Sequence, residues 1–413
     1  MSSDQPQEDQ HPVPTGVELT ALDERFRTDP FPVFEELREA DPVHYDEVLK
    51  RWVLTRHDDV DRVVNDRSLS VDPRKAADGT YMSLFRGEPR DDDVQPNILF
   101  LDPPDHTRLR GLVTKAFTPR AVERMRPRIQ EIVDELLDAV AGQDSFDLMD
   151  AFAMPLPTIV IAEMLGVDAA DQADFKHWSD EGILRFNPMI TEEESARADA
   201  AGLAMQEYLA RAVAERREAP RNDLISSMIA VEESGDQLTS EEIVTMTSLL
   251  LAAGNVTTTD LIGNGVLALL QHPTELQKLR DDPSLIKNAV EEVLRYDSPV
   301  VHTARVTLSD AEIEGCPIKK GESILTFLAS ANRDPDVYPN PNKFDITRED
   351  TRHHAFGGGI HYCLGAPLAR LEAEIGIGAL VQRFPTMRLA DEPLEWRRLP
   401  AFRGLIRLPV LVS

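Results

Sequence analysis

Cysteine, basic residues and long apolar runs are all scarce in this chain of 413 residues. Its two cysteines, Cys316 and Cys363, cannot form a disulfide framework or supply the four thiolates of an ordinary iron–sulfur cluster or Cys₄ zinc site. The 44 Lys and Arg residues are outnumbered by 73 Asp and Glu residues, and the net charge of −29 argues against a general binder of nucleic acid or anionic membranes. No uncharged apolar run reaches the ~20 residues that cross a bilayer, so we expect a soluble, cytoplasmic protein.

The sequence shows no division into several domains. Its first residues, MSSDQPQEDQHPVPTG, are polar and acidic and lack the positive start and apolar core of a signal peptide. We expect residues 1–20 to form a flexible polar tail. No internal repeat or low-complexity linker follows. Residues 21–413 are therefore predicted to form one domain, and we expect a monomer.

Helical periodicity dominates after about residue 119. The segments AVERMRPRIQEIVDELLDAV, ARADAAGLAMQEYLARAVAERREA and PSLIKNAVEEVLRY place apolar residues three and four positions apart. Strand-like pieces are short, as in RWVLTR, ESILTFLAS and RGLIRLPVLV. The pattern predicts a mainly α fold with small β-sheets.

The longest predicted helix runs from Ser240 to Gln271. Thr239 and Glu242 have the spacing of a capping box at its start, and Pro273 follows its end. At ~1.5 Å per residue it would extend roughly 48 Å, and it is largely apolar on all sides, which indicates a central position. Its middle, AAGNVTTTD, is poor in helix-forming residues. Either this stretch is a packing site whose threonines bond back to the preceding turn, or the helix opens there toward a ligand.

Cys363 lies in the glycine-rich segment AFGGGIHYCLG, directly before a strong helical pattern. Backbone N–H groups at a helix start stabilise a thiolate, and glycines let the main chain approach a flat ligand closely. Both features suit a metal–thiolate bond, although a buried structural cysteine in a turn is the alternative. Zinc is excluded by the lack of a second cysteine or a suitably spaced histidine pair nearby.

The pattern Phe356-x-x-Gly359-x-His361-x-Cys363-x-Gly365 resembles the haem-binding loop of the cytochrome P-450 superfamily. This resemblance implies the fold of a soluble bacterial P-450, in which haem b (iron protoporphyrin IX) lies between a long central helix and the cysteine loop. Cys363 would then be the proximal ligand of the iron. Three further residues resemble the family's buried ion-pair core behind this loop: Glu292, Arg295 and Arg348.

The same resemblance assigns other haem contacts and an oxygen-activating motif. Residues expected at the haem propionates are His106, Arg110, Arg305 and His361. AAGNVTTT resembles the distal motif of the family, with Gly254 at a kink and Thr257 as the hydroxyl that would face the bound oxygen. The acid that precedes the threonine in the family is replaced by Val256, which cannot relay a proton. Asn255 could order a water or simply pack, and Asp260 could lead protons in or simply be solvated.

The implied activity is a haem-thiolate monooxygenase that hydroxylates or epoxidises a lipophilic small molecule with O₂. No G-x-G-x-x-G fingerprint or ferredoxin cysteines occur, so we expect no flavin or iron–sulfur cluster in the chain and a separate ferredoxin with its reductase as donor. Because the acid is replaced, a peroxide-driven peroxygenase and an NADH-dependent nitric-oxide reductase stay open as alternatives. A non-catalytic binder of haem and a ligand is a third.

Two surfaces follow from the resemblance. Residues 106–128 contain seven Arg or Lys residues and one acid, and we expect an acidic ferredoxin to dock there, near Arg108, Lys115, Arg120 and Arg124. The substrate pocket is expected to be apolar and to accept a terpenoid, steroid, fatty acid or macrolide-like compound. The residues expected to line it are Ile98, Leu99, Leu249, Ala252 and Val301.

Overall fold

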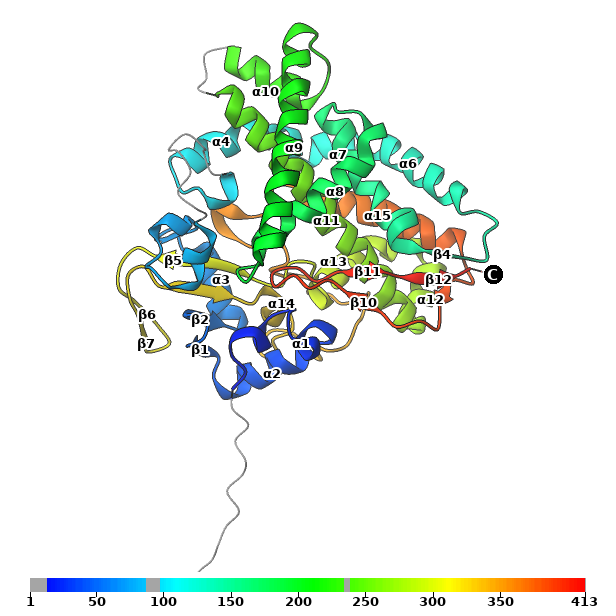
Figure 1. Ribbon diagram of the computed structural model, residues 1–413. Helices are drawn as coiled ribbons and strands as arrows, with labels where there is room; N and C mark the ends of the chain where they lie inside the picture. The colour runs from blue at the N-terminus through cyan, green and yellow to red at the C-terminus, as the bar shows by residue number, and fades with distance from the viewer. Residues whose placement is uncertain (1–12, 87–96, 234–237, 413) are drawn as a thin grey trace, which may run out of the picture.

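The computed structural model describes residues 13–86, 97–233 and 238–412. Helices make up most of it, and the strands lie in two places, one beside the N-terminal helices and the other near the C-terminus on the opposite side of the view (Figure 1). Within the described residues, no helix is both long and apolar enough to cross a membrane. The mainly α fold with small sheets that the sequence predicts is confirmed.

The N-terminal tail is shorter than predicted. Gly16–Leu19 form a 3₁₀ helix, and the Leu19 side chain is completely buried. The Thr15 hydroxyl donates a 2.7 Å hydrogen bond to Asp46, which ties this segment to the first strand. The expected boundary at residue 20 is therefore wrong, because an apolar anchor at Leu19 holds the preceding turn against the fold.

The central helix has the predicted bounds. α11 (Ser240–Gln271) begins with the capping box of Thr239 and Glu242, in which each side chain bonds the other residue's backbone N–H. It contacts α7 (Pro155–Leu165), α8 (Gln172–Gly182), α9 (Glu192–Glu218) and α15 (Ala366–Arg383), and it runs through the middle of the molecule (Figure 1). Pro273 is the first residue of the next helix, α12 (Pro273–Asp281), so α11 ends where the sequence predicts.

The remaining helices surround this core. The three helical segments named from periodicity lie on α5 and α6, on α9, and on α13, and those predictions are confirmed. The remaining α-helices are α1 (Glu24–Thr28), α2 (Phe31–Ala40), α3 (His57–Asn65), α4 (Asp105–Val113), α5 (Pro119–Glu123), α6 (Arg126–Ala139), α10 (Leu224–Glu233), α13 (Ile286–Tyr296) and α14 (Leu328–Ala331).

The largest sheet has the strand order β1-β2-β8-β5-β3, in which β2 and β8 are parallel and the other pairs are antiparallel. Its strands are β1 (Val43–Asp46), β2 (Arg51–Leu54), β3 (Leu69–Ser70), β5 (Thr303–Thr307) and β8 (Ser323–Thr326). A three-stranded sheet contains β4 (Ser145–Asp147), β12 (Pro409–Leu411) and β9 (Arg388–Leu389). Two hairpins are β6 (Ala311–Ile313) with β7 (Cys316–Ile318), and β10 (Glu395–Trp396) with β11 (Leu405–Arg407). The predicted strand pieces lie on β2, β8, β11 and β12.

Candidate active site

The Cys363 loop is held in shape by its own backbone and by α3. The Cys363 amide donates to the Phe356 carbonyl at 2.9 Å, and α15 begins three residues later. Gly359 has φ +61°, and a Cβ there would lie 2.6 Å from the Val64 carbonyl oxygen at the end of α3. A Cβ on Gly358 would lie 2.5 Å from the Val64 side chain. These two glycines are therefore required for packing of the loop on α3, a reason that the sequence did not reveal.

The Cys363 thiol is deep in the fold and still accessible. Burial raises its pKa, whereas the backbone amides of Gly365 and Ala366 and the Arg110 guanidinium lower it. The residue is nevertheless exposed at the protein surface. Its sulfur is therefore available to a ligand and faces donors that stabilise a thiolate. No group of three or more His, Cys, Asp or Glu side chains is placed to hold a metal in the described part of the chain.

Cationic and imidazole groups converge beside this loop with little negative charge. The His106 and His361 rings lie 4.2 Å apart, and both ring nitrogens of His106 are buried without a hydrogen-bond partner. Burial lowers the pKa of Arg305 to about 10 and that of His361 to about 3. Arg110 donates to the Tyr362 carbonyl. Among the described residues no carboxylate lies within ion-pair distance of Arg110 or Arg305.

Asp102, the acid whose charge acts on Arg305 and His361, is already engaged. The Asp102 carboxylate accepts from Lys75 at 2.6 Å and from the Ser70 hydroxyl at 2.5 Å. Buried cations need a counter-charge, and orphaned imidazole nitrogens need a partner. The residues present therefore fit a flat cofactor that carries anionic groups and an iron atom for Cys363, which is the chemistry of haem with its two propionates.

A buried ion-pair core lies behind the loop. Glu292 binds Arg295 at 2.7 Å and Arg348 at 3.2 Å, and the Glu292 and Arg295 side chains are completely inaccessible. Arg295 also donates to the carbonyls of Asn332 and Pro341, while the Asn332 side chain accepts from the His354 amide at the start of the loop. The structure therefore brings the three predicted residues together and connects them to the loop.

The middle of α11 carries an accessible stripe although the helix is central. Leu249, Ala252 and Thr257 are half-buried, and Ala253 is exposed, whereas most of the residues around them are buried. Three of the four are predicted site residues, and Ala253 is one that sequence reasoning missed. Positions spaced three and four apart share one helix face. The stripe therefore forms a second surface available to a ligand.

Comparison with known proteins identifies the family. The model of the family described as Cytochrome P450 matches residues 52–395. Cytochrome P450 107B1 of Saccharopolyspora erythraea is 42% identical over 401 residues, which cover 95% of this chain and 97% of that protein. The chain belongs to the cytochrome P450 family. As the names of its relatives indicate, it is a P450 monooxygenase, an oxidoreductase that binds haem.

Two further comparisons agree. The 6-deoxyerythronolide B hydroxylase of Saccharopolyspora erythraea is 40% identical over 398 residues, covering 93% of this chain and 96% of that protein. The solved structure of P450BioI in complex with a hexadec-9Z-enoic acid ligated acyl carrier protein has a TM-score of 0.87 and 38% identity, and it covers 95% of this P450 and 100% of that chain. The resemblance drawn from the Cys363 loop is confirmed.

The segment AAGNVTTT on α11 of this P450 is packed more tightly than one interpretation of its sequence expected. α11 continues through Gly254 without interruption, and a Cβ there would lie 3.2 Å from Ile161 of α7. The Thr257 hydroxyl donates to the Ala253 carbonyl at 2.9 Å. The packing interpretation therefore fits, and the kink at Gly254 stays a prediction. Asn255 is 3% exposed and accepts from the Thr158 hydroxyl at 2.9 Å, so it packs toward α7 and is not placed to order a water.

Asp260 is not solvated, contrary to one sequence interpretation. Its side chain is completely buried and pairs with Arg397 at 3.2 Å. Val256, at the family's acid position, is 3% exposed and packs in an apolar cluster with Ile183, Leu399 and Phe402. The central helix therefore carries an acid one turn beyond the expected place.

The expected pocket residues of the P450 are only partly brought together. Ile98 is buried, Leu99 is 41% exposed, and Leu249 and Ala252 lie on the accessible stripe of α11. Val301 instead is 2% exposed and packs in a core cluster with Phe26 and Phe327. No sequence pattern indicated the aromatic contacts next to Leu99, in which the ring centroid of Phe186 lies 6.2 Å from that of Phe100 and 5.4 Å from that of Phe402.

Several cations of the basic segment 106–128 are paired with acidic side chains in the structure. Arg108 pairs with Glu242 of α11 at 2.5 Å, so it is not free for a partner as predicted. Arg126 pairs with Glu123 and Glu374, and Arg128 pairs with Glu163, Glu131 and Glu135. In segment 106–128, the exposed cations for which no ion pair with a described residue is found are Lys115, Arg120 and Arg124.

Proposed function

We propose that this P450 inserts one oxygen atom from O₂ into a lipophilic small molecule, taking electrons from a separate ferredoxin and its reductase. The observation that carries the proposal is the buried Arg305, the half-buried Arg110 and the orphaned ring nitrogens of His106 near Cys363, with no carboxylate paired to either arginine among the described residues. Haem b would meet this set with its propionates. His106, Arg110, Arg305 and His361 would hold them, and Phe356 and Gly359 would shape the loop around the sulfur.

When haem is bound, it supplies the oxidising chemistry. The protein positions the substrate, shields the site from bulk water and delivers protons. Thr257 lies on the accessible stripe of α11, where its hydroxyl can accept a hydrogen bond from a water while it donates to Ala253. Ala252 and Leu249 on the same face exclude bulk water and hold an apolar substrate by burial. Glu292, Arg295 and Arg348 keep the loop rigid.

Electron delivery is proposed to use the exposed cations Lys115, Arg120 and Arg124. α5, which carries Arg120, contacts α15, the helix that begins after Cys363. Positive side chains without a partner steer an acidic protein and are sensitive to salt. Replacing Lys115 and Arg124 by Glu should lower the rate of reduction by an acidic ferredoxin and weaken its salt dependence, whereas Lys320→Glu on the turn before β8 should change neither.

The substrate is proposed to be a macrolide-like or fatty-acyl compound. One relative is named 6-deoxyerythronolide B hydroxylase, and one similar structure is a complex with a hexadec-9Z-enoic acid ligated acyl carrier protein. Apolar and aromatic side chains near Ile98, Leu249 and Phe402 suit either class.

A spectral titration tests this function. Purified ferric protein is titrated with macrolactones, fatty acids, terpenoids and steroids, and the haem absorption reports displacement of water from iron. A tight hit that gives product only with ferredoxin, reductase and NADPH supports the proposal. Direct oxidation of NADH on addition of nitric oxide would favour a reductase, which is the alternative that Val256 raises. Turnover with peroxide alone would favour a peroxygenase.

A further inference from the structure

Asp260 is a buried acid on the central helix with only half of its carboxyl group paired. The side chain is completely inaccessible, Oδ1 accepts from Nε of Arg397 at 3.2 Å, and Oδ2 has no hydrogen-bond partner. Burying a polar atom without a partner is costly, and such atoms in native proteins call for an explanation. A group that only anchored the fold would be expected to use both oxygens.

The β10–β11 hairpin builds the place for this carboxyl. The Arg397 amide donates to the Gly404 carbonyl at 3.0 Å, which sets the two residues opposite each other. A Cβ on Gly404 would lie 1.9 Å from Oδ1 of Asp260, so the hairpin supplies both the cation and the space. The acid, the arginine and the glycine form one unit across two distant parts of the chain.

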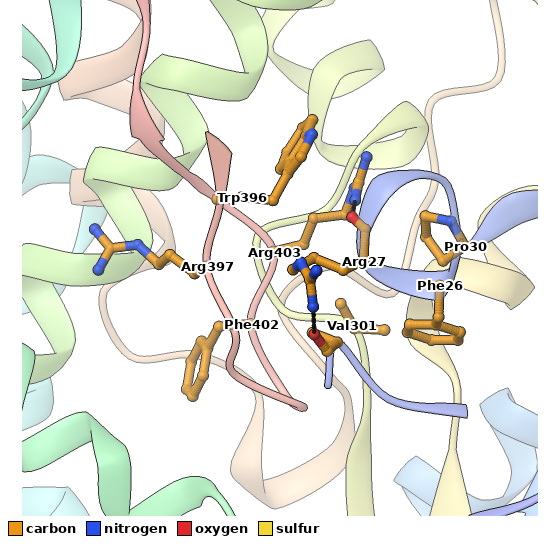
Figure 2. A pocket seen from close by; sticks show the side chains of 10 residues that line it. Phe26, Arg27, Pro30, Val301, Trp396, Arg397, Phe402 and Arg403 are labelled. Atoms are coloured by element: carbon orange, nitrogen blue, oxygen red, sulfur yellow. Dashed lines mark hydrogen bonds between the residues drawn. The ribbon is translucent and has the colours of Figure 1, made fainter. Parts of the chain in front are cut away.

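This unit is connected to solvent on two sides. Nη1 of Arg397 lies 3.3 Å from Oδ1 of Asp180 on α8, and the Asp180 side chain is 37% exposed. Arg397 and Gly404 also line a small hollow of about 10 Å³, the room for about one water, between the hairpin and the N-terminal segment that contains Phe26. Figure 2 shows Arg397 and Phe402 of the hairpin on one side of this hollow and Phe26 on the other. Water can therefore come within one residue of the buried carboxyl.

The position of Asp260 on α11 relates it to the oxygen side. Asp260 follows Val256 by four residues and Thr257 by three, and such positions are neighbours on a helix surface. The charged groups that face Asp260 are Arg397 from the hairpin and Asp180 from α8. Burial raises the pKa of Asp260 to about 6, against the lowering effect of Arg397. A carboxyl that titrates near neutral pH can both give and take a proton under working conditions.

We propose that Asp260 supplies the proton transfer that Val256 cannot, acting through Thr257 and refilled from solvent by way of the hollow and Asp180. This inference rests on the proposed O₂-dependent function. Asp260 gives a proton to a water bonded to the Thr257 hydroxyl and becomes a carboxylate opposite Arg397. It then takes a proton back from solvent and is neutral again. The protons consumed in each turnover come from water, and Asp260 is not used up.

The test compares variants of the haem-loaded protein. Asp260→Asn keeps the shape and the hydrogen bond to Arg397 but cannot transfer a proton. We expect the yield of product per NADPH to fall about tenfold or more, with hydrogen peroxide in its place, and the solvent deuterium isotope effect to change. The control is Asp174→Asn, an exposed acid on α8 outside the unit, which should behave as wild type. Val256→Asp in the Asp260→Asn background should restore most of the yield.

A second readout needs no turnover. Infrared difference spectra of the ferric protein between pH 5 and pH 8 should contain a carboxyl band that titrates near pH 6 and is missing in Asp260→Asn. Absence of the band, or wild-type yield in Asp260→Asn, would overturn the inference. A loss of yield that Val256→Asp does not restore, accompanied by a matching loss of thermal stability, would show a purely structural role. If the band is present but wild-type protein oxidises nothing with ferredoxin, the proposed function fails and the inference falls with it.

Discussion

Substituting Gly404 by alanine tests how tightly the hairpin and the central helix fit. The new Cβ would lie 1.9 Å from Oδ1 and 2.0 Å from Cγ of Asp260. Neither side can yield easily, because Asp260 is completely buried on α11 and Gly404 is bonded to Arg397 in the hairpin. Overpacking of a rigid core costs ~1–3 kcal/mol, and we expect the upper end of that range here. For a chain of this length, about 3 kcal/mol lowers the melting temperature by about 3–4 °C.

The assay is thermal unfolding of the haem-loaded protein in a double-mutant cycle. In an Asp260→Ala background the carboxyl group is gone, so Gly404→Ala should cost about 2 kcal/mol less than in wild type. An equal cost in both backgrounds would refute the reasoning, since the clash would then involve some other group. A neutral Gly404→Ala in wild type would show that the hairpin moves freely away from α11.

Four further outcomes can be measured. Gly359→Ala should reduce the haem content and the carbon monoxide difference spectrum, because its φ is +61° and its Cβ would lie 2.6 Å from the Val64 carbonyl oxygen. Arg305→Gln should speed haem loss to apomyoglobin by about tenfold or more, since one charge-assisted hydrogen bond contributes ~1.5–3 kcal/mol. Gly111 lies on α4, and a Cβ there would meet no atom within 4 Å, so Gly111→Ala should raise the free energy of unfolding in denaturant by about 0.5–1 kcal/mol. Asp260 has a pKa raised from 3.8 to about 6, so its ionised form destabilises the fold; relative to Asp260→Asn, wild type should lose ~1 kcal/mol of unfolding free energy between pH 5 and pH 8.

Features with local signals could be predicted from the sequence. The start of α11 follows from Thr239 and Glu242, three residues apart, and its end from Pro273. The Cys363 loop could be recognised because its spacing is long and specific. The ion-pair core of Glu292, Arg295 and Arg348 followed from the same resemblance, and the structure places the three in contact.

Sequence-based predictions were wrong for side chains whose partner lies far away in the sequence. Asn255 could have faced water, but its side-chain oxygen accepts a hydrogen bond from Thr158 on α7, 97 residues away in sequence. Arg108 looked like part of a docking patch, but Glu242 lies 134 residues further along and pairs with it. No local pattern identifies such contacts, because they depend on how two helices cross.

The family, the bounds of the central helix, the Cys363 loop and the presence of valine at position 256 could therefore be taken from the sequence alone. All of these depend on residue type and on spacing over short distances. Which charged groups are paired depends on the tertiary fold and has no local signal. It placed Arg397 and Gly404 of the hairpin against Asp260 of α11, more than 130 residues earlier in the chain. Burial is a property of the whole fold, and burial converts an ordinary aspartate into one whose pKa lies near 6.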